Sequence, residues 1–166
     1  MSGPTLYDDD ILLWSEQQAA VIRKLGETAR NLPNDLDIEN VAEEIESVGR
    51  SELAAVTSYL RLILLHLMKL AGDEASQDAV HWRSEIVGFH SDLMDRFAPS
   101  MRQRIDMGKI WRSARERLRA ADESAQRQFL ANLPEQCPFD IDDFIAEHID
   151  SFALVKRLRA GVATGS

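Results

Sequence analysis

The sequence predicts an all-α protein: a single-domain bundle of about five helices built around one long central helix. The segment from Asp37 to Leu70 contains no proline. Its apolar residues recur at an average step of about 3.6 residues, the period of an α-helix. Turn-rich connectors separate further segments in which apolar residues are three or four apart. A chain of 166 residues also has the length of one domain, and it can bury a substantial core without metals or disulfides.

The first helix is expected to begin near the acidic cluster Asp8–Asp10, because carboxylates there can accept hydrogen bonds from free backbone amides. It is expected to end near Gly26. The inner face of this helix is expected to carry Ile11, Trp14, Gln18, Val21, Ile22 and Leu25. A turn-rich connector, NLPNDLD, follows at residues 31–37, and Asp37 is the expected N-cap of the long helix.

Gly49 lies inside the predicted long helix, where a glycine costs on the order of 1 kcal/mol relative to alanine. One interpretation is a hinge that folds the segment into a hairpin. The other is a continuous helix in which the missing side chain lets a neighbouring helix approach closely. The apolar residues keep nearly the same angular phase on both sides of Gly49, which a hairpin does not require. The continuous helix is therefore preferred.

Three further helices are expected after a polar break at residues 71–77. The third helix is bounded by Pro99, and a rigid loop containing two prolines precedes the last one. These helices are expected at about residues 82–97, 101–130 with a kink or break near Asp122–Ser124, and 140–149. Residues 1–160 are assigned to a single helical domain, and residues 161–166 are expected to form a frayed C-terminal tail.

Three polar residues lie within or beside the apolar stripe of the long helix: Glu52, Tyr59 and His66, spaced by seven. Burying polar groups is costly unless they are hydrogen-bonded, so each is expected to have a partner. The preferred interpretation is a structural network. The alternative is a pocket in which His66 acts as a base or ligand, with Glu52 or Glu44 tuning its proton affinity. Because each step of seven residues is about 10 Å along the axis, the three cannot share one catalytic shell.

Candidate metal ligands do not form a known motif. Di-iron bundles place Glu-x-x-His on each of two helices, and this sequence contains none. His81 and Glu85 are correctly spaced but stand alone, while Glu43 and Glu46 fall away from the apolar stripe. A phosphate-binding glycine loop, a zinc-protease His-Glu-x-x-His and a glycine-flanked serine are also missing. We therefore predict no metal and no cofactor.

Charge is unevenly distributed. The chain carries −9, but residues 96–119 hold eight Lys or Arg against two acids, a local +6, so the remainder carries −15. A basic helix with Trp111 could suggest nucleic-acid binding. However, its cations project around the helix, and the acidic long helix offers them an internal partner. We therefore expect internal pairing and a solvated face, with nucleic-acid binding unlikely on charge grounds.

A cytoplasmic protein without a membrane segment is expected. The N-terminus carries acids where a secretory signal has a basic region, and the longest apolar run, Leu62–Leu65, is far too short to span a bilayer. The single cysteine, Cys137, cannot form an intramolecular disulfide, which favours a reducing compartment. We interpret Cys137 as a small apolar filler.

Six segments of this chain together resemble the bacterial "domain of unknown function 29" family, in order and spacing. They are YDDDILLW from Tyr7, EEIESVGRSE from Glu43, LRLILLHLMK from Leu60, HWRSEI from His81, PSM from Pro99 and LPEQCPF from Leu133. The resemblance runs from about Tyr7 to Ile149 and implies a helical cytoplasmic bacterial protein without a known activity. His81 stands where a serine is expected, and Met101 where a leucine is usual, so a hydroxyl at position 81 has no implied role.

Two functional hypotheses follow. The first is an interaction or structural module whose leftover apolar face, around Trp14, Trp82 or residues 60–70, binds a second copy or another protein. The second is an enzyme of unknown reaction that uses a polar cleft between helices. The candidate polar cluster for either consists of Glu43, Glu44, Glu46, Arg50, Glu52, His66, Lys69 and Arg83. Side chains that open into one pocket would favour chemistry, whereas internally satisfied ion pairs would favour a scaffold.

Overall fold

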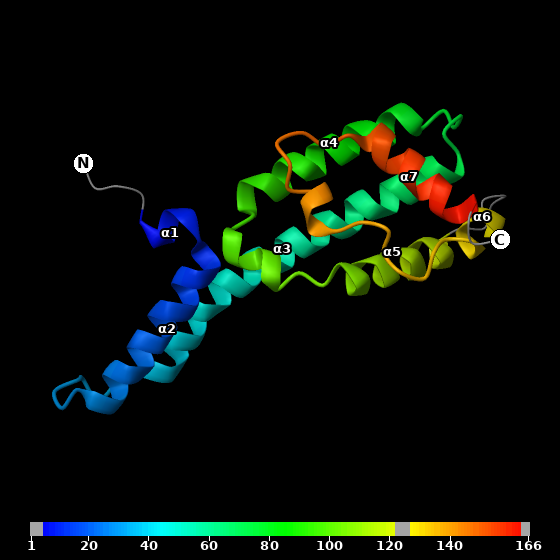
Figure 1. Cartoon of the computed structure of the whole chain (residues 1–166). Helices are drawn as coiled ribbons and strands as arrows, with labels where there is room; N and C mark the ends of the chain where they lie inside the picture. Colours follow the sequence, from blue (N-terminus) through cyan, green and yellow to red (C-terminus); the bar gives the residue numbers. More distant parts are fainter. Residues whose placement is uncertain (1–4, 122–126, 164–166) are drawn as a thin grey trace. The chain divides into compact units, whose positions relative to one another are not determined.

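The computed structural model describes residues 5–121 and 127–163, and Figure 1 shows its helices. In chain order the elements are α1 (Leu6–Asp9), α2 (Ile11–Thr28), α3 (Ile38–Gly72), α4 (Ala79–Arg96), the 3-10 helix η1 (Pro99–Gln103), α5 (Met107–Ala121), α6 (Arg127–Ala131), the 3-10 helix η2 (Ile141–Asp143) and α7 (Ser151–Ala163). No β-strand occurs within residues 5–121 or 127–163. The prediction of an all-α fold built around one long helix is confirmed.

The chain divides into two compact units, which are described separately. Unit 1 comprises residues 1–55 and 96–104, and unit 2 comprises residues 56–95 and 105–166. Helix α3 therefore supplies its first part to unit 1 and its second part to unit 2. The assignment of residues 1–160 to a single domain stays a prediction, because a helix common to both units is compatible with one domain or two.

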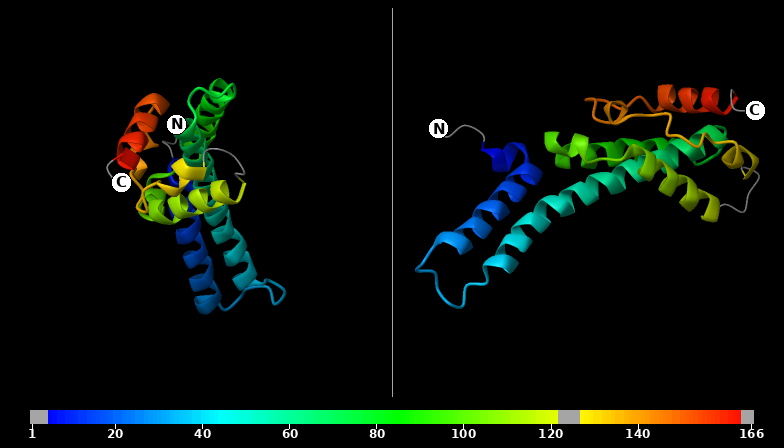
Figure 2. Two further views of the ribbon diagram at one scale, coloured as in Figure 1. Left: turned by 90° about the vertical axis from the view of Figure 1, so that its right-hand side faces the viewer. Right: turned by 60° about the horizontal axis from the view of Figure 1, so that its bottom comes forward.

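Unit 1 is an antiparallel helical hairpin of α2 and the first part of α3, which Figures 1 and 2 show side by side. Helix α3 runs without a break through Gly49. A Cβ atom added at Gly49 would lie 2.9 Å from the Cα atom of Leu12, so only a glycine lets α2 approach this closely. The prediction of a continuous helix with a close neighbour at Gly49 is confirmed.

Acidic N-caps begin both helices of this hairpin, as predicted. The N–H of Leu13 donates to Oδ1 of Asp10 at 3.0 Å, and the N–H of Asn40 donates to Oδ1 of Asp37 at 3.2 Å. These bonds satisfy amides that have no partner inside the helix. Asp10 also accepts hydrogen bonds from the backbone N–H and the hydroxyl of Ser100, at 2.8 and 2.7 Å, which tie η1 to the start of α2.

Unit 2 is built around the second part of α3. Because leucine, isoleucine and methionine side chains on several sides of this part are fully buried, it is a core helix rather than a surface helix. They are Leu60, Ile63, Leu64, Leu67, Met68 and Leu70. Figures 1 and 2 show α4 and α5 on different sides of this part of α3. By length and composition alone α3 could also cross a membrane, a test that the core helix of a soluble protein passes equally.

Two predicted helices differ from the structure. The helix expected over residues 101–130 is instead η1, a connector and then α5 and α6, because Asp106 caps a new helix by accepting from the N–H of Lys109 at 2.9 Å. The break expected at Asp122–Ser124 lies outside the described residues. The prediction of a helix over residues 140–149 is wrong: only η2 forms there, and α7 follows.

The aspartates of the wrongly predicted segment explain that error. Asp140 accepts from the N–H of Asp142 at 2.9 Å and donates its own N–H to Asp143 at 3.0 Å, a local bonding pattern that competes with an α-helix. Asp150 instead caps α7 by accepting from the N–H of Ala153 at 3.0 Å. Helix α7 continues to Ala163, so residues 161–163 of the predicted tail are helical. Residues 164–166 lie outside the described part of the chain.

Candidate functional site

The eight residues of the candidate polar cluster are divided between the two units. Five of them, Glu43, Glu44, Glu46, Arg50 and Glu52, belong to unit 1, and His66, Lys69 and Arg83 belong to unit 2. Their partners are described below one unit at a time.

An ion-pair network joins the two helices of unit 1. The guanidinium of Arg23 on α2 lies 3.0 Å from carboxylates of both Glu39 and Glu46, and 3.7 Å from that of Glu43. Arg50 pairs with Glu43 and lies 3.7 Å from Glu46. These side chains are between 29% and 71% exposed, so each pair contributes little on its own. The network forms one charged side of the hairpin.

The other two acids of unit 1 differ from each other. Both carboxylate oxygens of Glu52 accept hydrogen bonds from Nη1 of Arg96, at 2.9 and 3.1 Å. This contact supplies the partner that the position of Glu52 in the apolar stripe predicts. Glu44 is exposed, and its carboxylate makes no ion pair with any residue that the structure describes.

His66 is buried in unit 2, with 6% of its surface exposed, and both ring nitrogens face oxygen atoms. Nδ1 lies 2.8 Å from the carbonyl oxygen of Leu62 and must donate to it. Nε2 lies 2.7 Å from a carboxylate oxygen of Glu85 on α4. The expectation of a partner is confirmed, but that partner is Glu85 rather than Glu52 or Glu44. In the sequence, Glu85 stood out only by its four-residue spacing from His81. Nε2 of His81 also lies 3.5 Å from the Glu85 carboxylate.

Lys69 and Arg83 each stack on an aromatic ring of unit 2. The Nζ atom of Lys69 lies 5.5 Å from the ring centroid of Trp82, and the guanidinium of Arg83 lies 3.7 Å from that of Phe152. Such cation–π contacts contribute about 0.5–1 kcal/mol where exposed. Both cations therefore have structural partners.

Glu74 links Arg83 to the C-terminal helix. Its carboxylate pairs with Arg83 at 2.6 Å and with Arg159 of α7 at 2.5 Å. Arg159 Nε also donates to the carbonyl oxygen of Ala71 at 2.9 Å, where the last carbonyls of α3 have no partner within the helix. Sequence reasoning missed this link, because Glu74 follows α3 in the chain but only the tertiary fold brings Arg159 of α7 to the same end of α3.

Most of the eight side chains have partners of their own within the fold. Seven of the eight nominated side chains are engaged in ion pairs or ring contacts, as described above. One hollow of about 340 Å³ lies beside η2 and α7 and another of about 440 Å³ lies beside α5, and none of the eight residues lines either of them. Among the described residues, no three His, Cys, Asp or Glu side chains are grouped so that they could hold a metal.

An exposed apolar face runs along the hairpin of unit 1. The hairpin face consists of Val21, Leu25, Val41 and Val48, which are 58%, 42%, 39% and 44% exposed. At 100° per residue, Val41 and Val48 lie on one side of the buried line through Ala42 and Gly49 on α3, and the acids of the ion-pair network lie on the other.

The same projection separates Val21 and Leu25 from Arg23 on α2. Because Arg23 contacts the acids of α3, the charged sides of the two helices coincide. By the same projection Leu25 lies on the side of the hairpin that carries Val41 and Val48, and Val21 lies at the outer edge of that side. The hairpin presents one charged side and one apolar side, a combination that the sequence pattern of either helix alone did not reveal.

Comparisons with known proteins agree with the all-α fold. Residues 6–149 match a family described as "Domain of unknown function DUF29". A crystal structure of an α-helical protein of unknown function from Rhodospirillum rubrum ATCC 11170 is similar, with 38% sequence identity and a TM-score of 0.82. The match covers 95% of this chain and 99% of that one. Among curated proteins, none matches this sequence.

Proposed function

The chain belongs to the DUF29 family, and we propose that it is a cytoplasmic interaction module that self-associates through the hairpin face. The single observation that carries this proposal is the exposure of four large apolar side chains along one side of a two-helix hairpin. Soluble proteins cover most contiguous apolar surface of this kind, and an uncovered stripe is typical of an interface.

The hairpin has too little apolar burial of its own. Between residues 20 and 48, Ala42 alone is buried. Two helices can bury only the line along which they touch, so a second hairpin is needed to cover the remaining apolar side. Two hairpins packed face to face form a four-helix bundle, the standard way for helices to share such a surface.

Charge at the borders of the hairpin face is compatible with a second copy. Lys24 borders the face on α2 and Glu44 borders it on α3. Neither makes an ion pair with a residue that the structure describes, and both are exposed. In a two-fold arrangement of antiparallel hairpins, α2 of one copy lies against α3 of the other, which brings opposite charges together at both edges.

The size of the face sets the expected strength. Helix α2 has 18 residues, so the face is about 27 Å long and, with two helices side by side, about 20 Å wide. It would bury about 500 Å² per copy, at the lower limit for specific association. We therefore expect a weak dimer with a dissociation constant in the micromolar range.

A dilution series followed by sedimentation velocity tests the proposal. The protein is expected to be dimeric at high micromolar concentration and monomeric at low micromolar concentration. Val48→Glu, which places a charge in the hairpin face, is expected to be monomeric throughout. Val87→Glu is the matched control, because Val87 lies on α4 in unit 2 and is 59% exposed. A wild-type protein that stays monomeric, or equal loss of dimer in both variants, would contradict self-association through this face.

The residues nominated for catalysis support the same conclusion. Their ion-pair and ring contacts satisfy the expectation for a scaffold. His66, the strongest candidate base, is buried with both ring nitrogens engaged.

A further inference from the structure

The hollow beside α5 is lined by three arginines at positions 112, 115 and 119. Residues three and four apart lie on one side of a helix, so these side chains converge from one face of α5. Glu116, Glu135 and Gln136 complete the lining, and the volume of about 440 Å³ falls within the range of small-molecule sites. This hollow is separate from the hairpin face.

Arg115 is unusual because it is buried and makes no ion pair with an acid of the described residues. Only 9% of its surface is exposed, and no carboxylate of the described residues lies within 4 Å of its guanidinium. Its terminal nitrogens donate long hydrogen bonds of 3.3 Å to the carbonyl oxygens of Leu133 and Glu135. Its buried Nε has no hydrogen-bond partner. An uncompensated buried charge is costly, and proteins usually balance it with an anion.

The other two arginines of the hollow also make no ion pair with an acid in the part of the chain that the structure describes. Arg119 donates to the carbonyl oxygen of Leu130 at 3.1 Å. Neither Arg112 nor Arg119 makes an ion pair within the described residues. Two other cations of this segment pair with acids as the sequence led us to expect, Arg96 with Glu52 and Arg104 with Glu16. Burial, followed by the charge of Arg119, lowers the pKa of Arg115.

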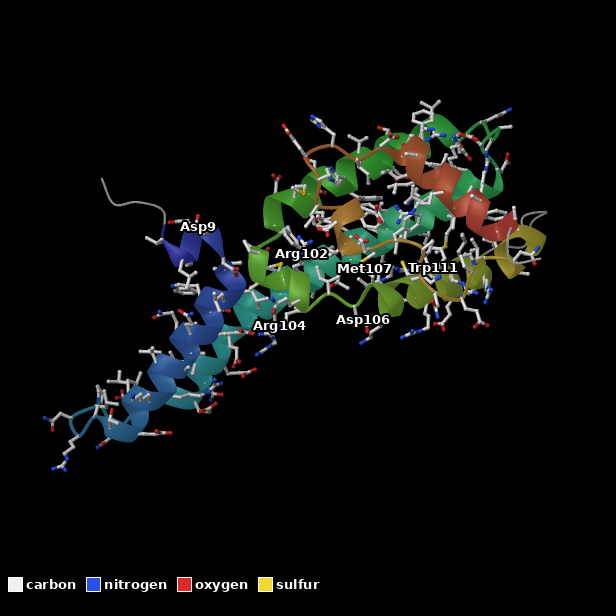
Figure 3. All side chains as sticks on the ribbon, in the orientation of Figure 1. Asp9, Arg102, Arg104, Asp106, Met107 and Trp111 are labelled. Atoms are coloured by element: carbon white, nitrogen blue, oxygen red, sulfur yellow. The ribbon has the colours of Figure 1, made fainter. Side chains whose placement is uncertain are left out.

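The walls of the hollow are held in place before any ligand binds. Trp111, labelled in Figure 3, is fully buried on α5, and its Nε1–H donates to the carbonyl oxygen of Pro134 at 2.9 Å. The loop that carries Glu135 and Gln136 is therefore attached to α5 at Pro134 as well as at Arg115. A pre-organised site loses less conformational entropy when a ligand binds.

We propose that this hollow binds a small carboxylate, held by Arg112, Arg115 and Arg119. A guanidinium offers two parallel N–H donors that match the two oxygens of a carboxylate. The three arginines and two glutamates of the lining carry a formal charge of +1, so a monoanion balances the site and a dianion such as phosphate exceeds it. The glutamates also disfavour a nucleic-acid backbone.

Titration with sodium acetate, followed by ¹H–¹⁵N NMR at constant ionic strength, tests this site. Acetate is expected to shift the Nε–H signal of Arg115 in a saturable manner, whereas chloride is not. Sodium phosphate at neutral pH is expected to bind more weakly. No saturable shift with acetate, or tighter binding of phosphate, would overturn the proposal.

Two variants on the surface of α5 complete the test. Arg112→Gln removes an exposed arginine of the hollow and is expected to weaken acetate binding about tenfold, the loss of one charge-assisted hydrogen bond. Arg117→Gln is the matched control, because Arg117 is exposed on the same helix but does not line the hollow. Equal affinities in the two variants would contradict a role for Arg112.

Discussion

Asp10 shows how one side chain can stabilise two segments of unit 1. It is 5% exposed, caps α2 through Leu13 and accepts two hydrogen bonds from Ser100 of η1. Burial by itself would raise the pKa of Asp10. The hydrogen bonds from Leu13 and Ser100 outweigh it, and the pKa lies below its ordinary value. The folded protein therefore stabilises the ionised form of the Asp10 side chain.

Replacement of Asp10 is expected to have a pH-dependent cost. Asp10→Ala should lower the free energy of unfolding by about 2 kcal/mol at pH 7, from the lost cap and the unpaired N–H of Ser100. Because the folded pKa is lowered, this stabilisation is complete above the pKa of an unfolded aspartate, about 3.9, and is lost as the pH falls below it. Urea unfolding at pH 7 and at pH 3 measures the difference.

Asp9→Ala is the control for this experiment. Asp9 is exposed and makes no side-chain hydrogen bond among the described residues, so its replacement should change stability little at either pH. A loss in Asp10→Ala that is the same at pH 7 and pH 3 would show that the carboxylate charge is not responsible.

His66 illustrates what a single residue in a sequence can and cannot predict. Its position in an apolar stripe predicts a partner, since a buried imidazole without one is costly. The identity of that partner depends on which residue of α4 faces α3, and the answer is Glu85. Glu52 precedes His66 in the same stripe by two steps of seven residues. Its partner, Arg96, likewise depends on the tertiary fold.

At the level of the helices, two glycines both lie in a helix interior but differ in how closely other atoms approach them. Gly49 lies against α2, where an added Cβ atom would be 2.9 Å from the backbone of Leu12. Gly88 lies in the interior of α4, where an added Cβ atom would meet nothing within 4 Å. Alanine is favoured over glycine in both helices by about 1 kcal/mol, so packing decides the sign of each substitution.

Gly49→Ala is expected to destabilise the protein by about 2 kcal/mol, because a backbone atom cannot move aside as a flexible side chain can. Gly88→Ala is expected to stabilise it by about 0.5–1 kcal/mol. Chemical denaturation of both variants provides the measurement. Stabilisation by Gly49→Ala would contradict the close approach of α2 and α3.

Helix boundaries were predictable where capping and apolar spacing agree. Asp10 and Asp37 mark the starts of α2 and α3, and apolar spacing marks α4. Between residues 140 and 149, apolar spacing suggested a helix, but the aspartates bind neighbouring amides instead. Local hydrogen bonds of this kind compete with a helix, and apolar periodicity does not register them.

For the molecule as a whole, self-association and stability should be linked. A dimer interface that forms only in the folded state makes the unfolding temperature depend on protein concentration. We expect the Tm to rise by about 2 °C between about 10 and 200 μM protein. Val48→Glu should remove this dependence without lowering the Tm of the monomer, because Val48 is already 44% exposed. Differential scanning calorimetry measures both, and a concentration-independent Tm in the wild-type protein would argue against a dimer.

The tertiary structure also decides which charged side chains form ion pairs. The sequence shows an excess of cations over residues 96–119 within an acidic protein. Arg96 and Arg104 pair with acids, while Arg112, Arg115 and Arg119 line a hollow and make no ion pair within residues 5–121 and 127–163. Net charge therefore did not reveal which cations are available to a ligand.

From its residues alone, this chain specifies α-helices, a long apolar core helix, a close helix contact at Gly49 and buried polar groups that need partners. These follow from the spacing of side chains and from the cost of leaving a polar group unpaired, which are properties of short segments. The tertiary structure decided that Glu85 is the partner of His66, that Leu25 lies on the same side of the hairpin as Val41 and Val48, and that Arg115 is buried. These features depend on contacts between residues distant in sequence, which no local pattern encodes.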